Sequence, residues 1–434
     1  MRDRERAYPR DLAAYARARW PEGAPPPPPE ELMASLIATA YHASLLRDEE
    51  RAVSFRLLHW SPEALSADAG PPTGLHRLRF ERPRPFDENE LRRLSPAAKF
   101  HRALIGVEGS NGDDLRIWGL AQSGPRWMHA AQGGRTVDAP PPDALIVTAM
   151  RPGHIGVACG AQPLAELRSG AIVDFGVDVF QSSWLPTRFV AMRNELLAAH
   201  EERRARAAGA EEAPWATVTP DIIRALAQQM IKRVVAIIRA AHHGGTIIVL
   251  PSATVPSVTG GDPLRLKYTF SDDAARRRFR ALLLEALTVP ARLGGAAGYT
   301  RVTRDEYRAS TEPVLAELDE AIFEVGQLIA ALADVDGAVV LTDAFELVGF
   351  GAEIAGQLPE VPTVLRALDL EGARRVEEVV DRVGTRHRSA YRLCARLRDA
   401  LAIVVSQDGS ARFVTWHEGA VTYWDHGALG VGED

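Results

Sequence analysis

The chain has 434 residues, of which 46% are hydrophobic and 25% charged, a composition typical of globular proteins with room for two or three hydrophobic cores. Its formal net charge of -6 argues against a general affinity for polyanions, so nucleic-acid binding is not expected and phosphate recognition would need a local arginine cluster. Cys159 and Cys394 lie far apart and lack neighbours at metal-binding spacing, which disfavours a zinc site and a disulfide framework.

The sequence shows no sign of membrane association. No apolar run approaches the roughly 18 to 20 residues that cross a bilayer, and the stretch MRDRERAYPRDL lacks the apolar core of a signal peptide. Together with the sparse cysteines, this predicts a protein of the reducing cytoplasm without a membrane partner.

The N-terminal half is predicted to hold a β-rich α/β domain behind a short tail. Residues 1–30 are charged and end in the run from Pro25 to Pro29, which favours extended polyproline II, so this segment is interpreted as a tail or strap. An apolar stripe between Leu32 and Leu45 predicts one helix. Short β-branched or aromatic runs then predict strands as far as about residue 190. We find no catalytic constellation in residues 31–197.

A change of composition separates the two halves. Residues 198–218 include a run that alternates charges with alanine, as is typical of a solvated helix or linker, and we place the domain boundary there. A helix is expected to begin at Thr219-Pro220, a capping residue followed by proline, and to stop at Gly244-Gly245. The apolar run from Thr246 to Leu250 predicts a buried strand directly after it.

The second half, residues 219–434, is predicted to be a mixed-sheet α/β domain. Two apolar runs with a polar break at Thr342-Asp343 predict a hairpin, and Asp408-Gly409 marks another hairpin turn. The other helices are expected over residues 272–287, 312–333 and 376–383, followed by a last helix that starts behind Gly384.

The segment VDRVGTRHRSAYRLCARLRDA, from Val380 to Ala400, places basic side chains at the start of that last helix. A helix N-terminus carries a partial positive charge and unpaired N–H groups, and therefore favours acidic side chains. Arg386, His387 and Arg388 consequently predict a negative partner, which could be a surface carboxylate or a nucleotide phosphate. Arginine suits a phosphate because its planar guanidinium presents a fork of donors.

Two further segments place small or polar residues at the ends of buried strands, where α/β folds keep their sites. They are Asp336-Gly337-Ala338 and Ser406-Gln407-Asp408. A nucleoside triphosphate needs a carboxylate for a divalent metal, cationic groups for phosphate oxygens, and a glycine where the backbone approaches the ligand. The three segments together supply all of these, whereas the chain contains no GxxxxGK[ST] phosphate loop and no correctly spaced dinucleotide fingerprint.

Four strings of this half resemble diadenylate cyclase domains of the DisA type. DGAVVLTDAFELVGFGAEI, GTRHRSA and LAIVVSQDG resemble the DGA motif, the RHR motif and the following strand of that family, and GGTIIVLPS resembles its first core strand. The resemblance covers roughly residues 219 to 426. The arrangement is similar to members without membrane helices that carry a sensor domain ahead of the cyclase. It implies that residues 31–197 form a sensor or regulatory domain, followed by a mixed-sheet α/β cyclase domain flanked by helices.

Diadenylate cyclases condense two ATP molecules into cyclic di-AMP, release two pyrophosphates and use a divalent metal. The resemblance therefore implies Mg²⁺ or Mn²⁺ held by Asp336 and Asp408. It assigns the chemistry to Asp336, Arg386, His387 and Arg388. It assigns ATP contacts to Gly337, Ala338, Gly384, Thr385 and Ser406. Because each site in the family supplies half of the reaction, it also implies a homodimer or higher homo-oligomer with face-to-face sites.

Two features depart from the family pattern. Gln407 and Asp408 stand where many relatives have two glutamates, which removes one carboxylate and shortens the other. The spacers before Asp336 and between Ala338 and Gly384 are also longer than in compact members. Two alternatives to an active cyclase thus stay open: a catalytically degenerate sensor that binds a nucleotide or cyclic dinucleotide, and an interaction scaffold that binds neither.

Overall fold

The computed structural model of this chain describes residues 6–65, 70, 75–100, 102–111, 114–124, 127, 141–168, 170–174, 178–208, 214–241, 243–310, 312–407 and 409–426. It divides into two compact units, residues 1–175 with 428–434 and residues 176–427. Both units are mixed α/β, which confirms the predicted fold class. Within the described ranges, no helix is both long and apolar enough to cross a membrane.

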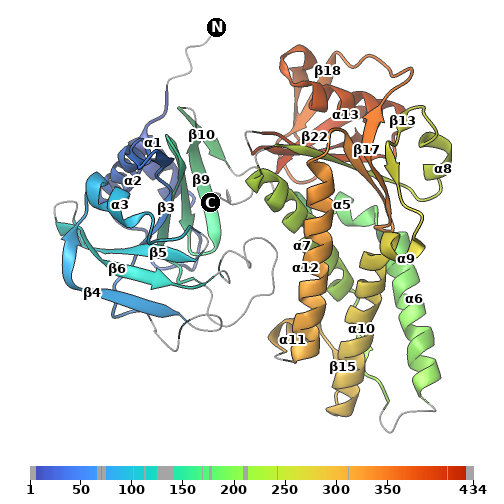
Figure 1. Ribbon diagram of the computed structural model, residues 1–434, viewed down its shortest axis with the longest axis horizontal. Helices are drawn as coiled ribbons and strands as arrows, with labels where there is room; N and C mark the ends of the chain where they lie inside the picture. Colours follow the sequence, from blue (N-terminus) through green and yellow to red (C-terminus); the bar gives the residue numbers. More distant parts are fainter. Residues whose placement is uncertain are drawn as a thin grey trace. The chain divides into compact units, whose positions relative to one another are not determined.

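The N-terminal unit is built on a mixed sheet whose described part has eight strands in the order β10-β9-β8-β7-β3-β5-β6-β4 (Figure 1). Neighbouring strands are antiparallel except β3 and β5, which run parallel with Leu57 opposite Ile105. Along the chain the strands are β3 (Phe55–His59), β4 (His76–Pro85), β5 (Ala103–Glu108), β6 (Arg116–Gln122), β7 (Leu145–Arg151), β8 (His154–Cys159), β9 (Gln162–Arg168) and β10 (Ala171–Asp174). The short strands β1 (Arg47–Asp48) and β2 (Arg51–Ala52) form a separate ladder.

Helices cover one face of this sheet. Alternation along β3 sends Phe55 and Leu57 into the larger core with α1 and α2, whereas Leu58 joins a smaller core on the opposite face. The helices are α1 (Pro9–Arg17), α2 (Glu30–Ser44) and α3 (Glu88–Leu94). The interpretation of residues 1–30 as a tail or strap is therefore wrong in part, because α1 buries Leu12 and Ala16 in the larger core. Only its proline run keeps the form of a strap.

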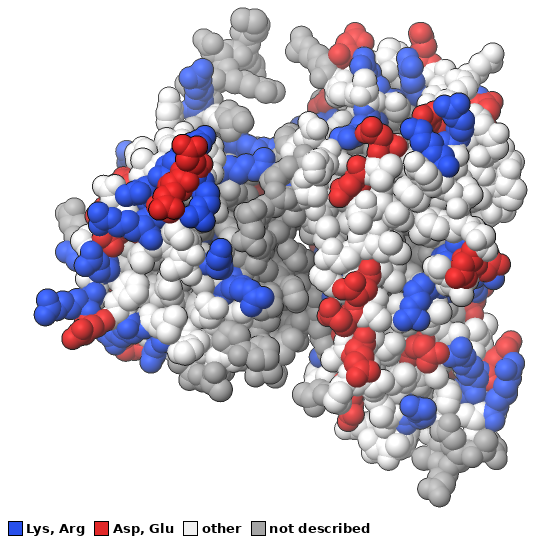
Figure 2. Space-filling view, in the orientation of Figure 1, with Lys and Arg blue, Asp and Glu red and all other residues white. Residues whose placement is uncertain are grey.

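Strand β4 was not predicted because it lacks an apolar face. It lies at the edge of the sheet, is exposed over most of its length, and carries arginines and prolines, as edge strands commonly do. Its arginines pair with nearby acids, Arg79 with Glu63 and Arg84 with Glu90. Figure 2 shows basic and acidic side chains intermixed on the face it draws. Paired charges of this kind do not make a polyanion-binding surface.

The C-terminal unit holds a larger mixed sheet, whose described strands follow the order β13-β17-β16-β12-β20-β21-β22-β18-β19, with β14 also paired to β17. The central strand β12 runs parallel to β16 and antiparallel to β20. The strands are β12 (Gly245–Leu250), β13 (Leu264–Arg265), β14 (Tyr268–Thr269), β16 (Ala338–Thr342), β17 (Leu347–Ile354), β18 (Thr363–Ala367), β19 (Arg375–Val379), β20 (Leu401–Val405), β21 (Ala411–His417) and β22 (Ala420–His426). A separate parallel pair joins β11 (Thr217–Val218) to β15 (Arg301–Val302).

Four long helices lie side by side next to this sheet in Figure 1: α6 (Val190–Ala207), α7 (Asp221–Ala240), α10 (Arg278–Ala296) and α12 (Pro313–Ala333). They bury their apolar faces in one core with the facing side chains of β12, β16 and β20. Helix α13 (Thr385–Arg396) packs on β20 and β21 within a second core. The short helices are α5 (Trp184–Thr187), α8 (Val255–Val258), α9 (Asp273–Arg276) and α11 (Arg304–Ala309).

The two units divide earlier than the linker predicted at residues 198–218. Helix α6 begins before that segment and buries Met192 and Leu196 in the core of the C-terminal unit. A charged residue of the predicted linker also contributes to this packing, because Arg203 forms an ion pair with Glu285 of α10. The alternating charges therefore mark the exposed face of a packed helix.

Other helix predictions need correction. Residues 376–383 form strand β19 and a 3₁₀ turn, because Val376 and its neighbours pair with β18. The helix predicted over 272–287 is split into α9 and α10, and α10 continues through Pro290. Helix α7 begins at Asp221, and the Thr219 hydroxyl, expected to cap it, is buried without a hydrogen-bond partner.

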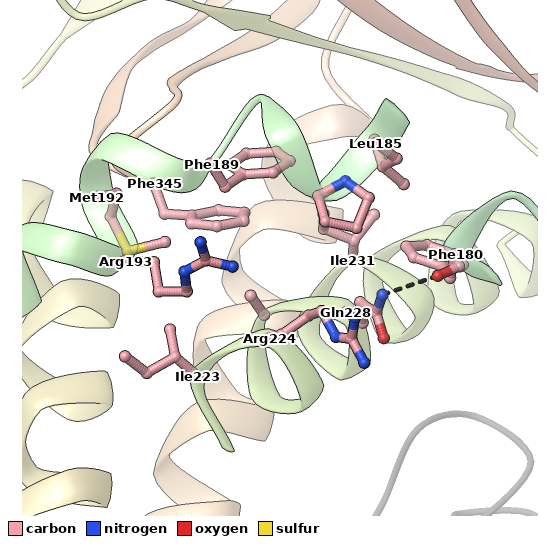
Figure 3. A pocket seen from close by; sticks show the side chains of 12 residues that line it. Phe180, Leu185, Phe189, Met192, Arg193, Ile223, Arg224, Gln228, Ile231 and Phe345 are labelled. Atoms are coloured by element: carbon pink, nitrogen blue, oxygen red, sulfur yellow. Dashed lines mark hydrogen bonds between the residues drawn. The ribbon is translucent and has the colours of Figure 1, made fainter. Parts of the chain in front are cut away.

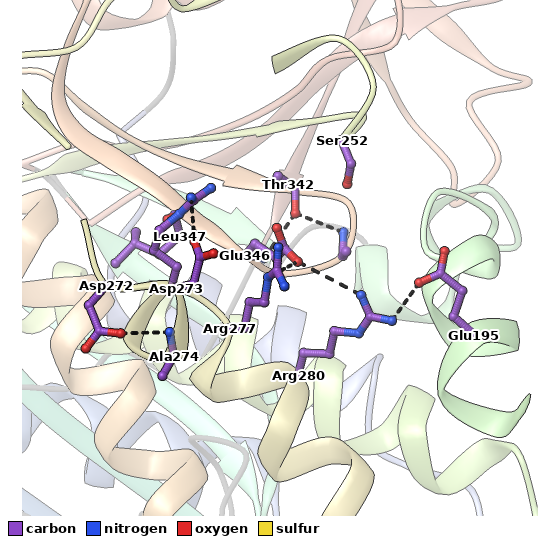
Figure 4. Close-up of polar contacts among 12 residues, drawn as sticks. Glu195, Ser252, Asp272, Asp273, Ala274, Arg277, Arg280, Thr342, Glu346 and Leu347 are labelled. Atoms are coloured by element: carbon purple, nitrogen blue, oxygen red, sulfur yellow. Dashed lines mark hydrogen bonds and ion pairs between the residues drawn. The ribbon is translucent and has the colours of Figure 1, made fainter. Parts of the chain in front are cut away.

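The hairpin predicted at Thr342-Asp343 is confirmed, since β16 and β17 are antiparallel neighbours. The Thr342 hydroxyl accepts hydrogen bonds from the backbone N–H groups of Ala344 and Glu346 and thereby shapes the turn. The Glu346 carboxylate lies 3.1 Å from Arg277 and 3.9 Å from Arg280, so the turn is tied to α10 (Figure 4).

Candidate functional site

The candidate site is built on the ends of three neighbouring strands, β16, β12 and β20, which lie side by side in the C-terminal sheet. Thr246 on β12 lies opposite Ala338 on β16, and Gly245 lies opposite Val405 on β20. The segments just outside these pairs, Asp336-Gly337 and Ser406-Gln407, therefore flank the entry of the central strand. They are separated by two strand spacings, about 10 Å.

Arg386 connects the start of α13 to this edge. Its Nη1 donates a hydrogen bond to the His243 carbonyl at 2.9 Å, just before β12. The contact is close, because a Cβ atom on Gly244 would lie 2.7 Å from the same Nη1. Within the described residues its guanidinium makes no ion pair. The arginine is thus held by a neutral carbonyl, and no acid among the described residues compensates its positive charge.

His387 joins the same helix start to the end of β20. It is buried, with its Nε2 3.4 Å from the Ser406 hydroxyl and its ring inclined toward Tyr391. Ser406, the residue that follows β20, is half-buried. This contact shows that Ser406 lies beside the cationic start of α13.

The N-terminus of α13 is open. No acidic residue lies in its first turn, Thr385 is exposed, and the N-cap Gly384 makes no side-chain cap. A Cβ atom on Gly384 would meet no atom within 4 Å, and its φ of -64° suits any residue. The fold therefore does not require glycine at this position. Arg388 is exposed and has no ion-pair partner in the described part of the chain.

Gly337 is required by the fold itself. Its φ is 119°, a left-handed conformation, and a Cβ atom there would lie 2.5 Å from the carbonyl carbon of Gly351 on β17. The preceding Asp336 is exposed at the strand edge, and the described residues offer its carboxylate no ion pair. The turn at Gly337 places Asp336 just ahead of β16, beside the entry of the central strand.

The carboxylates available for a divalent metal are few. No group of three or more histidine, cysteine, aspartate or glutamate side chains suited to a metal occurs among the described residues, and the predicted ligand Asp408 lies outside them. Mg²⁺ in nucleotide sites is held by one or two carboxylates together with phosphate oxygens and water. Among the described residues of these strand ends, the unpaired carboxylate is that of Asp336, which fits a metal that arrives with a nucleotide and does not fit a resident metal.

Neither cysteine supplies a nucleophile. Burial raises the pKa of the Cys394 thiol, behind α13, to about 12, and that of Cys159 in the N-terminal unit to about 11. Both thiols therefore stay protonated at neutral pH, and neither can act as a nucleophile in the candidate site.

Two cavities of the C-terminal unit lie away from these strand ends and serve a nucleotide poorly. The cavity in Figure 3 offers about 30 Å³, room for roughly two water molecules, and its walls are mostly apolar side chains of α5, α6 and α7. Its one drawn polar contact is the Gln228 amide donating to the Phe180 carbonyl. A cleft of about 390 Å³ lies at the opposite ends of β12 and β20, but there Arg188 is engaged by the Asp399 carbonyl and the Thr415 hydroxyl, and Asp343 by Ser252.

The predicted site residues thus fall into two groups. The structure brings together the segments of Asp336 to Ala338, Gly384 to Arg388, and Ser406 around the entry of β12, and Asp408 lies outside the described residues. The roles of the His243 carbonyl and of Gly351 could not be predicted from the sequence, because any residue type can supply a backbone acceptor or a backbone contact. The Gly244-Gly245 pair was interpreted as a helix stop. It could also have indicated that a side chain, here Arg386, lies close to the backbone at Gly244.

Comparison with known families matches residues 22–122 to a family described as probable sensor domain DACNV. This is the N-terminal domain of diadenylate cyclase proteins, and it supports the sensor domain expected ahead of the cyclase. No model of the cyclase catalytic domain matches the chain. No curated protein matches it significantly.

Proposed function

We propose that the C-terminal unit is a diadenylate cyclase that condenses two ATP molecules into cyclic di-AMP, under the control of the N-terminal sensor unit. The observation that carries the proposal is the cationic start of α13, which lies beside the entry of β12 and the end of β20 and is held by the His243 carbonyl without an acidic partner among the described residues. The matched sensor domain supports the same assignment.

The reaction needs the 3′-hydroxyl of one ATP to attack the α-phosphate of the other, forming a ribose–phosphate bond as the bond to pyrophosphate breaks. Arg386, Arg388 and the free N–H groups of α13 would bind the phosphate oxygens and stabilise the charge that develops on them. Asp336 would hold the divalent metal. When bound, Mg²⁺ or Mn²⁺ would neutralise phosphate charge and orient the reacting oxygens.

The candidate site of one chain would bind one nucleotide. Cyclic di-AMP contains two symmetry-related phosphodiester bonds, so two sites facing each other across a two-fold axis can form both. We therefore include a homodimer in the proposal. A cytoplasmic location remains part of it, since ATP and a reducing environment are found there.

The direct test is to incubate the full-length chain with ATP, GTP, CTP and UTP in Mn²⁺ or Mg²⁺ and to identify products by mass spectrometry. We expect cyclic di-AMP and pyrophosphate in a one-to-two ratio. A folded protein that yields no cyclic dinucleotide with either metal would contradict the assignment.

A degenerate nucleotide sensor is the second candidate, and Gln407 favours it. Gln407 is exposed, with its backbone nitrogen beside Gly244, and stands where many cyclases carry a glutamate, so the site has fewer carboxylates for a metal. Titration calorimetry distinguishes the two candidates, because saturable binding of ATP or cyclic di-AMP without turnover would indicate the sensor.

A further inference from the structure

The N-terminal unit contains a cavity of about 570 Å³ that has no part in the proposed cyclase chemistry. It lies at the carboxyl ends of β3 and β5, the parallel pair of this sheet, beside the start of β7. Carboxyl ends of parallel strands are a common place for ligands, and the volume is within the range of small-molecule sites.

The sheet side of the cavity is fixed. His59 ends β3, and its Nε2 lies 3.0 Å from the Gly109 carbonyl behind β5. Trp60 follows His59, is half-buried, and accepts a hydrogen bond on its carbonyl from the indole of Trp118. These contacts join the two strand ends and the adjacent indole into a preformed wall.

The run from Pro25 to Pro29 also lines the cavity. The Trp20 indole Nε1 donates to the Pro25 carbonyl at 2.8 Å at one end of the run, and Pro29 is the N-cap of α2 at the other. A polyproline segment held at both ends loses little conformational entropy when a ligand binds against it.

The charge of the lining is one-sided. Glu108 and Asp143 are the carboxylates among the described lining residues, which include no lysine or arginine. Arg116 lies opposite Glu108 on β6, but its guanidinium donates to the Leu115 carbonyl and does not line the cavity. Such a lining repels nucleotides and other anions.

We propose that this cavity is the ligand site of the sensor unit and that it binds a small organic cation, an amine or a quaternary ammonium compound. The faces of Trp20 and Trp60 attract a cation through their π-electrons, and Glu108 and Asp143 supply the opposite charge. ATP and cyclic di-AMP are excluded by their charge, so the site does not sense the substrate or product of the proposed cyclase.

The test is calorimetric titration of the full-length protein with choline and, separately, with putrescine. We expect saturable binding of at least one of them, weakened about fivefold or more by Asp143→Asn and by Trp60→Phe. The matched control Glu81→Gln changes an exposed acid on the edge strand β4 and should leave the affinity unchanged.

The melting temperature of each variant is compared first, and Asp143→Asn provides the second route if Trp60→Phe does not fold, since Asp143 is exposed. Absence of saturable binding of both cations would overturn the proposal. So would affinities that both cavity variants leave unchanged, or tighter binding of inorganic phosphate than of either cation at this cavity.

Discussion

The Arg386 guanidinium donates a hydrogen bond to the His243 carbonyl at 2.9 Å, joining the start of α13 to the residue just ahead of the central strand. A cationic side chain at a helix N-terminus is unfavourable in isolation, because both carry positive charge. The carbonyl holds the arginine in place without neutralising it. Since no acid among the described residues pairs with it, the positive charge stays available at these strand ends, and a triphosphate would remove the conflict.

Replacing Arg386 should weaken nucleotide binding without unfolding the protein. Charge-assisted hydrogen bonds contribute roughly 1.5 to 3 kcal/mol, so Arg386→Ala should raise the dissociation constant for ATP by at least about tenfold. The side chain is exposed, and the melting temperature should change little. Arg392→Ala, an exposed arginine on the same helix, is the matched control and should bind ATP like the original chain. Equal affinities of the two variants would count against the site.

Two glycines should respond oppositely to alanine. Gly337→Ala places a Cβ atom 2.5 Å from the Gly351 backbone at a φ of 119°, and should cost about 3 kcal/mol or more of folding free energy. Gly384→Ala enters open space at an ordinary φ and should cost under about 1 kcal/mol, yet obstruct a phosphate at the helix start. Urea unfolding measures the first effect and ATP titration the second. Unimpaired ATP binding by Gly384→Ala would mean that no ligand approaches this backbone.

Glu346 allows stability to be separated from function. Its carboxylate is largely buried between Arg277 and Arg280, so Glu346→Gln should lower the free energy of unfolding by about 1 kcal/mol. The turn lies at the far end of β16 from Asp336, and ATP affinity should not change. A loss of affinity that matches the loss of stability would show that binding reports only on folding.

The buried thiols predict a pH dependence. Because burial raises the pKa of Cys394 to about 12, the folded state keeps this proton at a pH where the unfolded chain, with a thiol pKa near 8.5, releases it. Its contribution to stability is complete below the unfolded pKa and is lost as the pH rises from about 9 towards 12. Iodoacetamide at pH 8 should leave Cys394 unmodified until urea unfolds the protein, as read by mass spectrometry. Rapid modification of the folded protein would contradict the burial.

Much of the architecture could be predicted from the sequence where periodicity was strong. The run from Thr246 to Leu250 is the central strand, and the break at Thr342-Asp343 is a hairpin turn. The helix predicted over residues 376–383 was wrong. A short segment with valines spaced three to four apart fits a helix as well as a strand, and only the pairing with β18 decides between them. Edge strand β4 has no apolar face to detect.

The candidate site could be predicted in part, because glycine, aspartate and arginine are recognisable in the sequence when they stand at the ends of predicted strands or at the start of a helix. What the sequence could not supply were the contacts made by backbone atoms. The His243 carbonyl that holds Arg386 and the Gly351 backbone that requires Gly337 depend on the pairing of strands distant in sequence. Asp336 was expected to hold metal and Gly337 to line the nucleotide, and the structure adds that Gly337 is needed by the fold.

The central claim is that the α13 start binds a triphosphate whose metal is held by Asp336. The most direct measurement titrates ATP into the original chain and Asp336→Asn, with Mg²⁺ and with EDTA, and follows cyclic di-AMP in the same samples. We predict that Mg²⁺ tightens ATP binding to the original chain by about tenfold or more, that Asp336→Asn loses this gain, and that only the original chain forms product. Equal binding and turnover by both proteins would contradict the account.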